Sequence, residues 1–319
     1  MIVANITTMS GFLLLGFSDI RELQVLHAFL FLVMYLLTLT GNFIIIITTL
    51  DQHLQSPMYY FLKHLSLLDL SFISVTVPQS IENSLMDDGY ISQGQCMFQV
   101  FFFTSLTWAE VAILTVMSDD RYAAICFPLH YEVIMHPSKC KWAVTAVWLS
   151  GSISGILFTA ATFSITFCRH KIIHQFFCDV PQLVKLSCSN DYLGVVGVAA
   201  FLSAMVLTCF TSIVLSYIHI FSTVLRIPSA EGQSKAFSTC LPHLFVVSFF
   251  LSACIFEFLK PTSDSPSAFD LMVSIFYLVI PPILNPVIYS LRNEVMKGAF
   301  RKLLLGGEFT RKKTFLSCH

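Results

Sequence analysis

The sequence predicts an all-α membrane protein, a seven-transmembrane helix bundle followed by a short amphipathic C-terminal helix. The chain is 55% hydrophobic and only 12% charged, whereas about one quarter of a soluble domain is charged. It also contains seven apolar runs long enough to cross a bilayer, which takes about 20 residues. These runs are approximately 24–50, 58–82, 96–119, 142–165, 194–224, 237–259 and 269–291. We therefore expect one transmembrane domain over 24–291, between an amino-terminal segment, 1–23, and a tail, 292–319.

The distribution of lysine and arginine predicts the orientation of the bundle. Thirteen of the 18 lie on the side reached after the first, third, fifth and seventh runs. Because these residues resist translocation, the amino terminus is expected outside and the carboxyl terminus in the cytosol. Residues 1–23 show no basic segment followed by a cleavage site, so we expect the first helix to lead insertion. The net charge of −1 gives no indication of a nucleic-acid partner, and none is expected.

The side predicted to be outside carries a glycosylation sequon and an even number of cysteines. The sequon is Asn5-Ile6-Thr7. The four cysteines can pair in three ways in an oxidising compartment, and the spacing alone does not choose among them. They are Cys96, Cys168, Cys178 and Cys188.

Polar residues inside the first three runs predict a polar pocket at membrane depth. Asn42 needs a partner within the bundle. Asp69 lies ~18 Å along the second helix from Pro57, and Glu110 lies ~16 Å from Arg121 on the third, so the two acids share a level. Intramembrane carboxylates usually mark function. A pocket tied to conformational switching is favoured over static packing of protonated carboxyls. Ion transport is the least favoured interpretation, because no ladder of further acids or histidines crosses the membrane.

The third run ends in residues 117–126, where acidic residues meet an arginine. Arg121 is costly near lipid unless a partner such as Asp120 neutralises it, so a charge pair that opens and closes is one interpretation. The alternative is that Arg121 only marks where the helix leaves the bilayer.

The later runs predict packing and bending sites. Gly151 and Gly155 have the spacing of close helix packing, within this bundle rather than between copies. Pro242 and Pro286 allow helices to bend, as a signalling switch requires, although a fixed kink gives the same pattern. Beyond them, residues 295–304 alternate apolar and basic residues at helical spacing, which predicts a helix lying on the inner leaflet lipids.

Several segments resemble those of vertebrate olfactory receptors, of the rhodopsin-like G-protein-coupled class, in order and spacing. They are residues 57–59, 117–126, 216–217, 235–240 and 282–293. The resemblance covers nearly the whole chain, and residues 241–243 and 249–252 resemble a minor branch, the fourteenth human family. It implies a plasma-membrane receptor without a cofactor, which binds a small volatile odorant and activates the stimulatory olfactory G protein to raise cyclic AMP.

The resemblance also implies roles for single residues. Cys96 would bridge Cys178, and Cys168 would bridge Cys188. The G-protein switch would consist of Asp120, Arg121, Tyr122, Tyr217, Asn285, Pro286 and Tyr289, and the central polar pocket of Asn42, Asp69 and Glu110. Two departures stand out, because Asp119 replaces the usual tyrosine before Asp-Arg, and Leu251-Ser252 replaces a frequent Tyr-Gly.

The predicted odorant site lies four to five turns outward of Arg121 on the third helix. Phe103, Thr104, Thr107 and Trp108 share a face there, because positions three and four apart align. Similarity to the family adds Phe201, Met205, Ala253, Cys254, Glu257, Ile275 and Leu278. The mostly apolar lining suits a small hydrophobic volatile, and Glu257 either contacts its polar group or faces water or Lys260.

Two rival functions are weaker. An enzyme is disfavoured because neither a His-Glu-x-x-His nor a Gly-x-Ser-x-Gly motif occurs. A proton or ion transporter would use Asp69 and Glu110. His170 and His174 stand four apart near cysteines, but disulfide sulfurs are poor metal ligands and no metal site is predicted.

Overall fold

The computed structural model describes most of the seven predicted helices and part of the connecting loops. The described residues are 11–14, 21–50, 56–86, 89–167, 172–188, 192–259, 278–289 and 298, with side chains up to residue 252 in the last long helix. Predictions that fall on residues 1–10, including Asn5, lie outside this part of the chain. The same is true of the predicted inner-leaflet helix over 295–304, apart from the backbone of residue 298.

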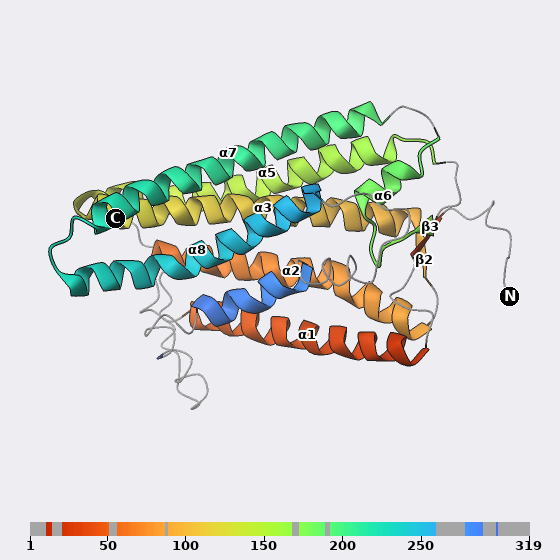
Figure 1. Ribbon diagram of the computed structural model, residues 1–319, viewed down its shortest axis with the longest axis horizontal. Coiled ribbons are helices and arrows are strands. Elements are labelled where there is room, and N and C mark those ends of the chain that lie inside the picture. Colours follow the sequence, from red (N-terminus) through yellow and green to blue (C-terminus); the bar gives the residue numbers. More distant parts are fainter. Residues whose placement is uncertain are drawn as a thin grey trace.

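The helices run side by side along the long axis of the molecule (Figure 1). The long ones are α1 (Arg21–Thr48), α2 (Pro57–Met86), α3 (Gln93–Cys126), α5 (Pro137–Phe163), α7 (Leu193–Val224) and α8 (Ala230–Leu259). All six are long and apolar enough to cross a membrane, and Leu278–Tyr289 is a shorter apolar helix among the described residues. The fold is the predicted seven-helix bundle. Short elements lie between the spans, namely η3 (Pro128–His130), α4 (Tyr131–Ile134) and α6 (Val180–Lys185).

Several helices extend beyond the apolar runs that predicted them. α3 continues to Cys126 rather than ending at residue 119, and α8 begins at Ala230 rather than at residue 237. Hydropathy detects only the part of a helix that suits hydrocarbon, whereas the backbone hydrogen-bond ladder continues into the polar interface. Arg121 therefore lies inside a helix, not after its end.

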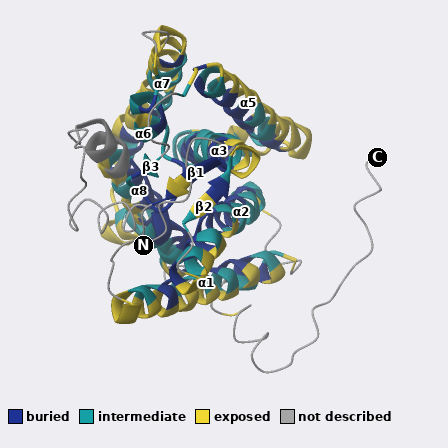
Figure 2. Ribbon diagram, turned by 90° about the vertical axis from the view of Figure 1, so that its right-hand side faces the viewer, coloured by how far each residue is buried: buried dark blue, intermediate teal, exposed yellow. Residues whose placement is uncertain are grey.

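α3 occupies the centre of the bundle and packs against α2, α5, α7 and α8 (Figure 2). Its contact with α5 depends on two small residues, as predicted. A Cβ on Gly151 would lie 2.5 Å from the Ser105 carbonyl oxygen, and one on Gly155 would meet the Ser105 hydroxyl and lie 2.8 Å from the Phe101 carbonyl oxygen. Glycine at both positions lets the two backbones approach closely.

The outward faces of the helices are apolar. Phe29 on α1, Ile153 on α5 and Leu207 on α7 are exposed, and exposed residues cover the outer faces of the bundle in Figure 2. Large apolar side chains on the outside are typical of a protein whose solvent is lipid, because hydrocarbon imposes no cost on their exposure.

One end of the bundle is closed by a small sheet, and we call it the disulfide end. β1 (Gly11–Leu14) pairs antiparallel with β2 (Tyr90–Ser92) and parallel with β3 (Ile172–Ile173). Phe12 and Leu14 are buried there in a separate hydrophobic cluster that includes a disulfide between Cys96 and Cys178. The other end of the bundle is called the Arg121 end.

Candidate functional site

At the Arg121 end, the buried carboxylate of Asp120 binds two other side chains. Asp120 Oδ2 lies 3.8 Å from an Arg121 guanidinium nitrogen, and its Oδ1 accepts a hydrogen bond of 2.7 Å from the Tyr131 hydroxyl. Burial and the neighbouring Asp120 carboxylate raise the pKa of Tyr131, which keeps its hydroxyl protonated and able to donate. The carboxylate thus links α3 to the short helix α4.

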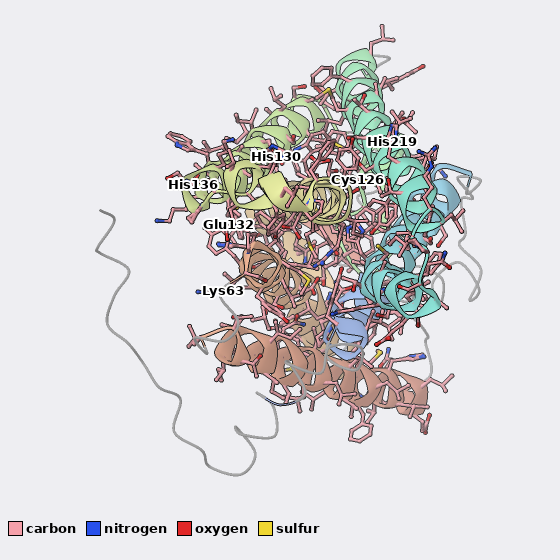
Figure 3. The ribbon with its side chains drawn as sticks, turned by 90° about the vertical axis from the view of Figure 1, so that its left-hand side faces the viewer. Lys63, Cys126, His130, Glu132, His136 and His219 are labelled. Carbon is pink, nitrogen blue, oxygen red and sulfur yellow. A yellow bond between two sulfur atoms is a disulfide. The ribbon has the colours of Figure 1, made fainter. Side chains whose placement is uncertain are left out.

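The neighbouring Asp119, which departs from the family pattern, faces another helix. Its Oδ1 lies 3.5 Å from the Ser216 hydroxyl of α7, which donates to it. Tyr122 packs edge-on against Phe127 and tilts over His219 of α7. Figure 3, which looks onto this end, shows His219 on α7 across from the segment after α3.

Further into the bundle, two buried hydrogen bonds of one histidine connect three helices. The Tyr217 hydroxyl lies 2.8 Å from His243 Nδ1, and His243 Nε2 lies 3.0 Å from the Leu114 carbonyl oxygen. A carbonyl only accepts, so Nε2 carries the proton, and in the neutral ring Nδ1 accepts from Tyr217. α7, α8 and α3 are therefore connected through one imidazole.

Two residues of the predicted polar pocket, Asn42 and Asp69, make buried hydrogen bonds to the last described helix. Asn285 donates to both oxygens of Asp69, at 3.0 and 3.2 Å. Glu110 on α3 is also buried. Asn42 donates to the Pro282 carbonyl oxygen at 2.9 Å, which ties α1 to the last helix.

The last described helix, Leu278–Tyr289, carries two further residues of the predicted switch. A Cβ on Gly41 would lie 3.0 Å from the Cβ of Pro286, so α1 and this helix are in close contact. Tyr289 is buried, and its hydroxyl has no hydrogen-bond partner among the described residues.

The predicted ligand face of α3 combines aromatic rings with unpartnered polar atoms. Phe103 stacks on Phe177 at 5.7 Å between centroids and lies 5.3 Å from Phe72. One turn along, the buried Thr107 Oγ1 and Trp108 Nε1 find no hydrogen-bond partner in the described part of the chain. Such atoms are rare in folded proteins and call for an explanation, such as a ligand.

Other predicted lining residues are placed differently. Phe201 and Met205 on α7 are 58% and 41% exposed, so the structure does not bring them together with Phe103. The family resemblance predicted that this helix contributes to the ligand site, but it did not predict which of its residues face the interior of the bundle. Thr104 is partly buried, and Leu278 is buried at the start of the last helix.

Comparison with known proteins identifies the family. The sequence profile described as olfactory receptor matches residues 31–306. Olfactory receptor 14J1 of Homo sapiens is 64% identical over 98% of this chain and 98% of its own length. Olfactory receptor 14A16 of Homo sapiens is 50% identical over 97% of this chain and 100% of its own length, and olfactory receptor 1G1 of Gorilla gorilla gorilla is 42% identical over 94% and 96%. The chain belongs to the olfactory receptor family.

As an olfactory receptor, the chain is a multi-pass membrane protein with the expected disulfide between Cys96 and Cys178. Gln99 Oε1 also accepts a hydrogen bond of 3.1 Å from the Cys178 amide, which fixes the loop further. Cys188 is disulfide-bonded as well, while its expected partner, Cys168, lies outside the described residues.

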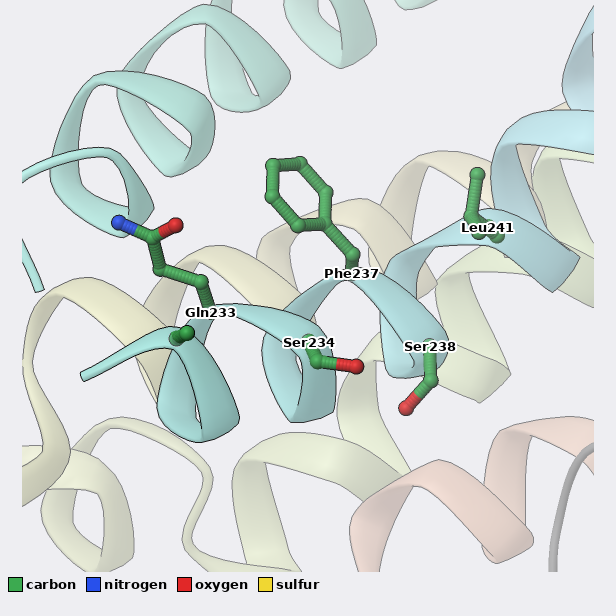
Figure 4. A pocket seen from close by; sticks show the side chains of 6 residues that line it. Gln233, Ser234, Phe237, Ser238 and Leu241 are labelled. Atoms are coloured by element: carbon green, nitrogen blue, oxygen red, sulfur yellow. The ribbon is translucent and has the colours of Figure 1, made fainter.

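Four predicted ligand residues of the receptor cannot be placed in the lining. Ala253, Cys254 and Glu257 lie on α8, but their side chains are outside the described part. Ile275 also falls outside it. An open cavity of 410 Å³ does occur on α8, but at the Arg121 end rather than at the predicted ligand face (Figure 4). Phe237 and Leu241 provide its apolar lining, and Gln233, Ser234 and Ser238 its polar lining.

Two residues that form side-chain hydrogen bonds in this olfactory receptor, His243 and Tyr131, were not among the predicted site residues. His243 was noted only as part of a branch-like segment, although an ionisable residue inside an apolar run is itself a functional signal. Tyr131 follows a proline-containing loop and gave no periodic pattern, so only the fold revealed its bond to Asp120.

Proposed function

We propose that this olfactory receptor binds small, mostly hydrophobic volatiles between its helices near Phe103 and activates a stimulatory G protein at the Arg121 end, raising cyclic AMP. The disulfide end then faces outward and the Arg121 end faces the cytosol, in keeping with the lysine and arginine distribution. The observation that supports the proposal is that one helix, α3, contributes residues both to the predicted ligand region and to the Arg121 end. Its 34 residues extend about 50 Å, and they include both Phe103 in the predicted ligand region and the Asp120–Arg121 pair.

The segment after α3 supports a protein partner at the Arg121 end. Leu129 is 94% exposed and Val133 69% exposed, in a short helical segment beyond the end of the span. Apolar side chains exposed to water outside a bilayer are typical of docking surfaces. Because Tyr131 in the same segment bonds Asp120, a partner bound there would act directly on the Arg121 pair.

The apolar character of the ligand region supports a hydrophobic ligand. Phe103 and Phe177 stack, and Leu278 is buried on the last helix. Sites for small molecules are usually mostly apolar with a few polar groups that fix orientation. A volatile of this kind would also partition readily into the surrounding lipid.

The test is a cyclic AMP assay in cells that display an epitope-tagged receptor, across a panel of volatiles. Arg121→Ala should abolish the response at matched surface staining. Arg226→Ala, which removes an exposed arginine at the same end of the bundle, should leave it intact. An Arg121→Ala receptor that still responds fully would contradict the proposed switch.

A second candidate function is proton or cation transport, favoured by the two acidic residues, Asp69 and Glu110, that are buried on membrane-spanning helices. It predicts a pH- or voltage-driven flux in liposomes that Asp69→Asn or Glu110→Gln removes. Wild-type liposomes no leakier than empty ones would eliminate this alternative.

A further inference from the structure

Most threonine hydroxyls on the described helices bond a backbone carbonyl one turn earlier. On α3, Thr115 donates to the Val111 carbonyl oxygen at 2.9 Å, and Thr162 on α5 and Thr208 on α7 do the same at 2.7 and 2.9 Å. Thr107 is an exception, as is Thr159 on α5. The Oγ1 of Thr107 is buried and has no hydrogen-bond partner among the described residues, so its hydroxyl is free to bond something else.

The neighbouring Trp108 also differs from the other two tryptophans in the surroundings of its indole N–H. Trp148 Nε1 lies 3.4 Å from His64 Nδ1, to which it donates, and Trp142 is 74% exposed. Trp108 Nε1 is buried without a partner in the described part of the chain. An indole N–H only donates, so whatever satisfies it must carry a hydrogen-bond acceptor.

The two groups border an apolar wall. Phe103 lies one turn from Thr107 on the same face of α3, and its ring stacks on Phe177 and contacts Phe72. A molecule lying along this face meets aromatic carbon on one side and one or two donors about 6 Å further along the helix.

We propose that Trp108 and Thr107 select odorants that carry an oxygen acceptor, foremost a carbonyl, on a hydrophobic skeleton. This rests on the odorant-receptor function proposed above and specifies its ligand class. The carbonyl oxygen accepts from the indole N–H or from the threonine hydroxyl, while the hydrocarbon part packs against Phe103. A hydrocarbon of the same size would enter the aromatic region but leave the buried N–H unpaired, which disfavours its binding.

The test compares straight-chain methyl ketones, aldehydes and acetate esters with alkanes of equal heavy-atom number in the cyclic AMP assay. Thr107→Val removes the hydroxyl and keeps the size of the side chain, and Trp108→Phe removes the N–H and keeps an aromatic ring. Trp142→Phe and Thr115→Val are the matched controls, because the first indole is exposed and the second hydroxyl is already bonded to its own helix. Surface staining normalises every variant.

We expect carbonyl compounds to activate the wild type and alkanes to fail. Trp108→Phe should raise the half-maximal concentration about tenfold, as the loss of one buried hydrogen bond implies, with a similar or smaller rise for Thr107→Val and none for the controls. Wild-type responses to alkanes as strong as those to ketones, or unchanged potency in both donor variants, would overturn the inference and leave the receptor function standing.

Loss of the receptor function itself has a different signature. In that case no volatile raises cyclic AMP, and Arg121→Ala does not change the basal level. A binding measurement separates the two further, because it needs no G protein. In purified receptor, ketones should quench tryptophan fluorescence in the wild type and in Trp142→Phe but not in Trp108→Phe, and quenching that persists in Trp108→Phe counts against the inference.

Discussion

The Tyr131 hydroxyl and Arg121 bind opposite oxygens of the same Asp120 carboxylate, the hydroxyl at 2.7 Å and the guanidinium at 3.8 Å. The shorter contact goes to the residue outside the long helices. A partner that moves the segment containing Tyr131 therefore changes the surroundings of Asp120, and hence of Arg121, without touching either.

Tyr131→Phe should lower odorant-stimulated cyclic AMP several-fold at unchanged surface expression, because the exposed segment then loses its tie to α3. Glu132→Gln, in the same helix and exposed, is the control. Equal responses in both variants and the wild type would show that the bond has no role in coupling.

The same bond should be insensitive to pH over the physiological range. The pKa of Tyr131 is raised above its ordinary value of 10.0 by burial and by Asp120, so the protonated donor is favoured in the folded state. Its contribution is complete below pH 10 and is lost as the pH rises through the raised value. The difference in thermal stability between the wild type and Tyr131→Phe, measured in nanodiscs from about pH 6 to about pH 9, should stay constant.

Asn285→Leu should destabilise the receptor by about 2–3 kcal/mol, because it removes two hydrogen bonds to Asp69 and leaves a buried carboxyl unpaired. Thermal unfolding of the purified protein measures this. Thr40→Val, which removes an exposed hydroxyl bonded only to its own helix, should have little effect. If the two variants unfold together, the pairing of Asp69 does not contribute to stability.

Gly155→Val should reduce the amount of folded receptor, because any side chain there collides with Ser105 and Phe101 of α3. Overpacking of this kind costs about 1–3 kcal/mol. Gly197→Val on α7 is the matched control, since a Cβ there meets nothing within 4 Å. Fluorescence-detected size exclusion reports both, and similar profiles would argue against close packing of α3 and α5.

Cys178→Ser should destabilise the receptor by about 4 kcal/mol, because the bond to Cys96 closes a long loop, with a sequence separation of 82. Cys209→Ser, which alters a free and partly buried cysteine, should be nearly neutral. Surface staining with and without a mild reductant measures the effect, and reductant should lower the wild type toward the level of Cys178→Ser.

Much of the architecture followed from patterns in the chain. Apolar runs of helical length predicted seven spans, and the glycine spacing predicted the contact of α5 with another helix of the bundle. Helix ends were less predictable, because hydropathy changes at the edge of the hydrocarbon while the helix of Arg121 continues.

The sequence by itself determined which residues this protein buries in a membrane, because every span must be apolar, and it identified Asp69, Glu110 and Arg121 as costly exceptions. Only the tertiary structure decided their partners. Asn285 reaches Asp69 from 216 positions away, and His243 joins Tyr217 to Leu114. Among the described residues, Trp108 Nε1 has no hydrogen-bond partner, whereas Trp148 Nε1 has one. Hydrogen bonds act over about 3 Å in space, and periodicity along one helix carries no record of which face of another helix lies against it.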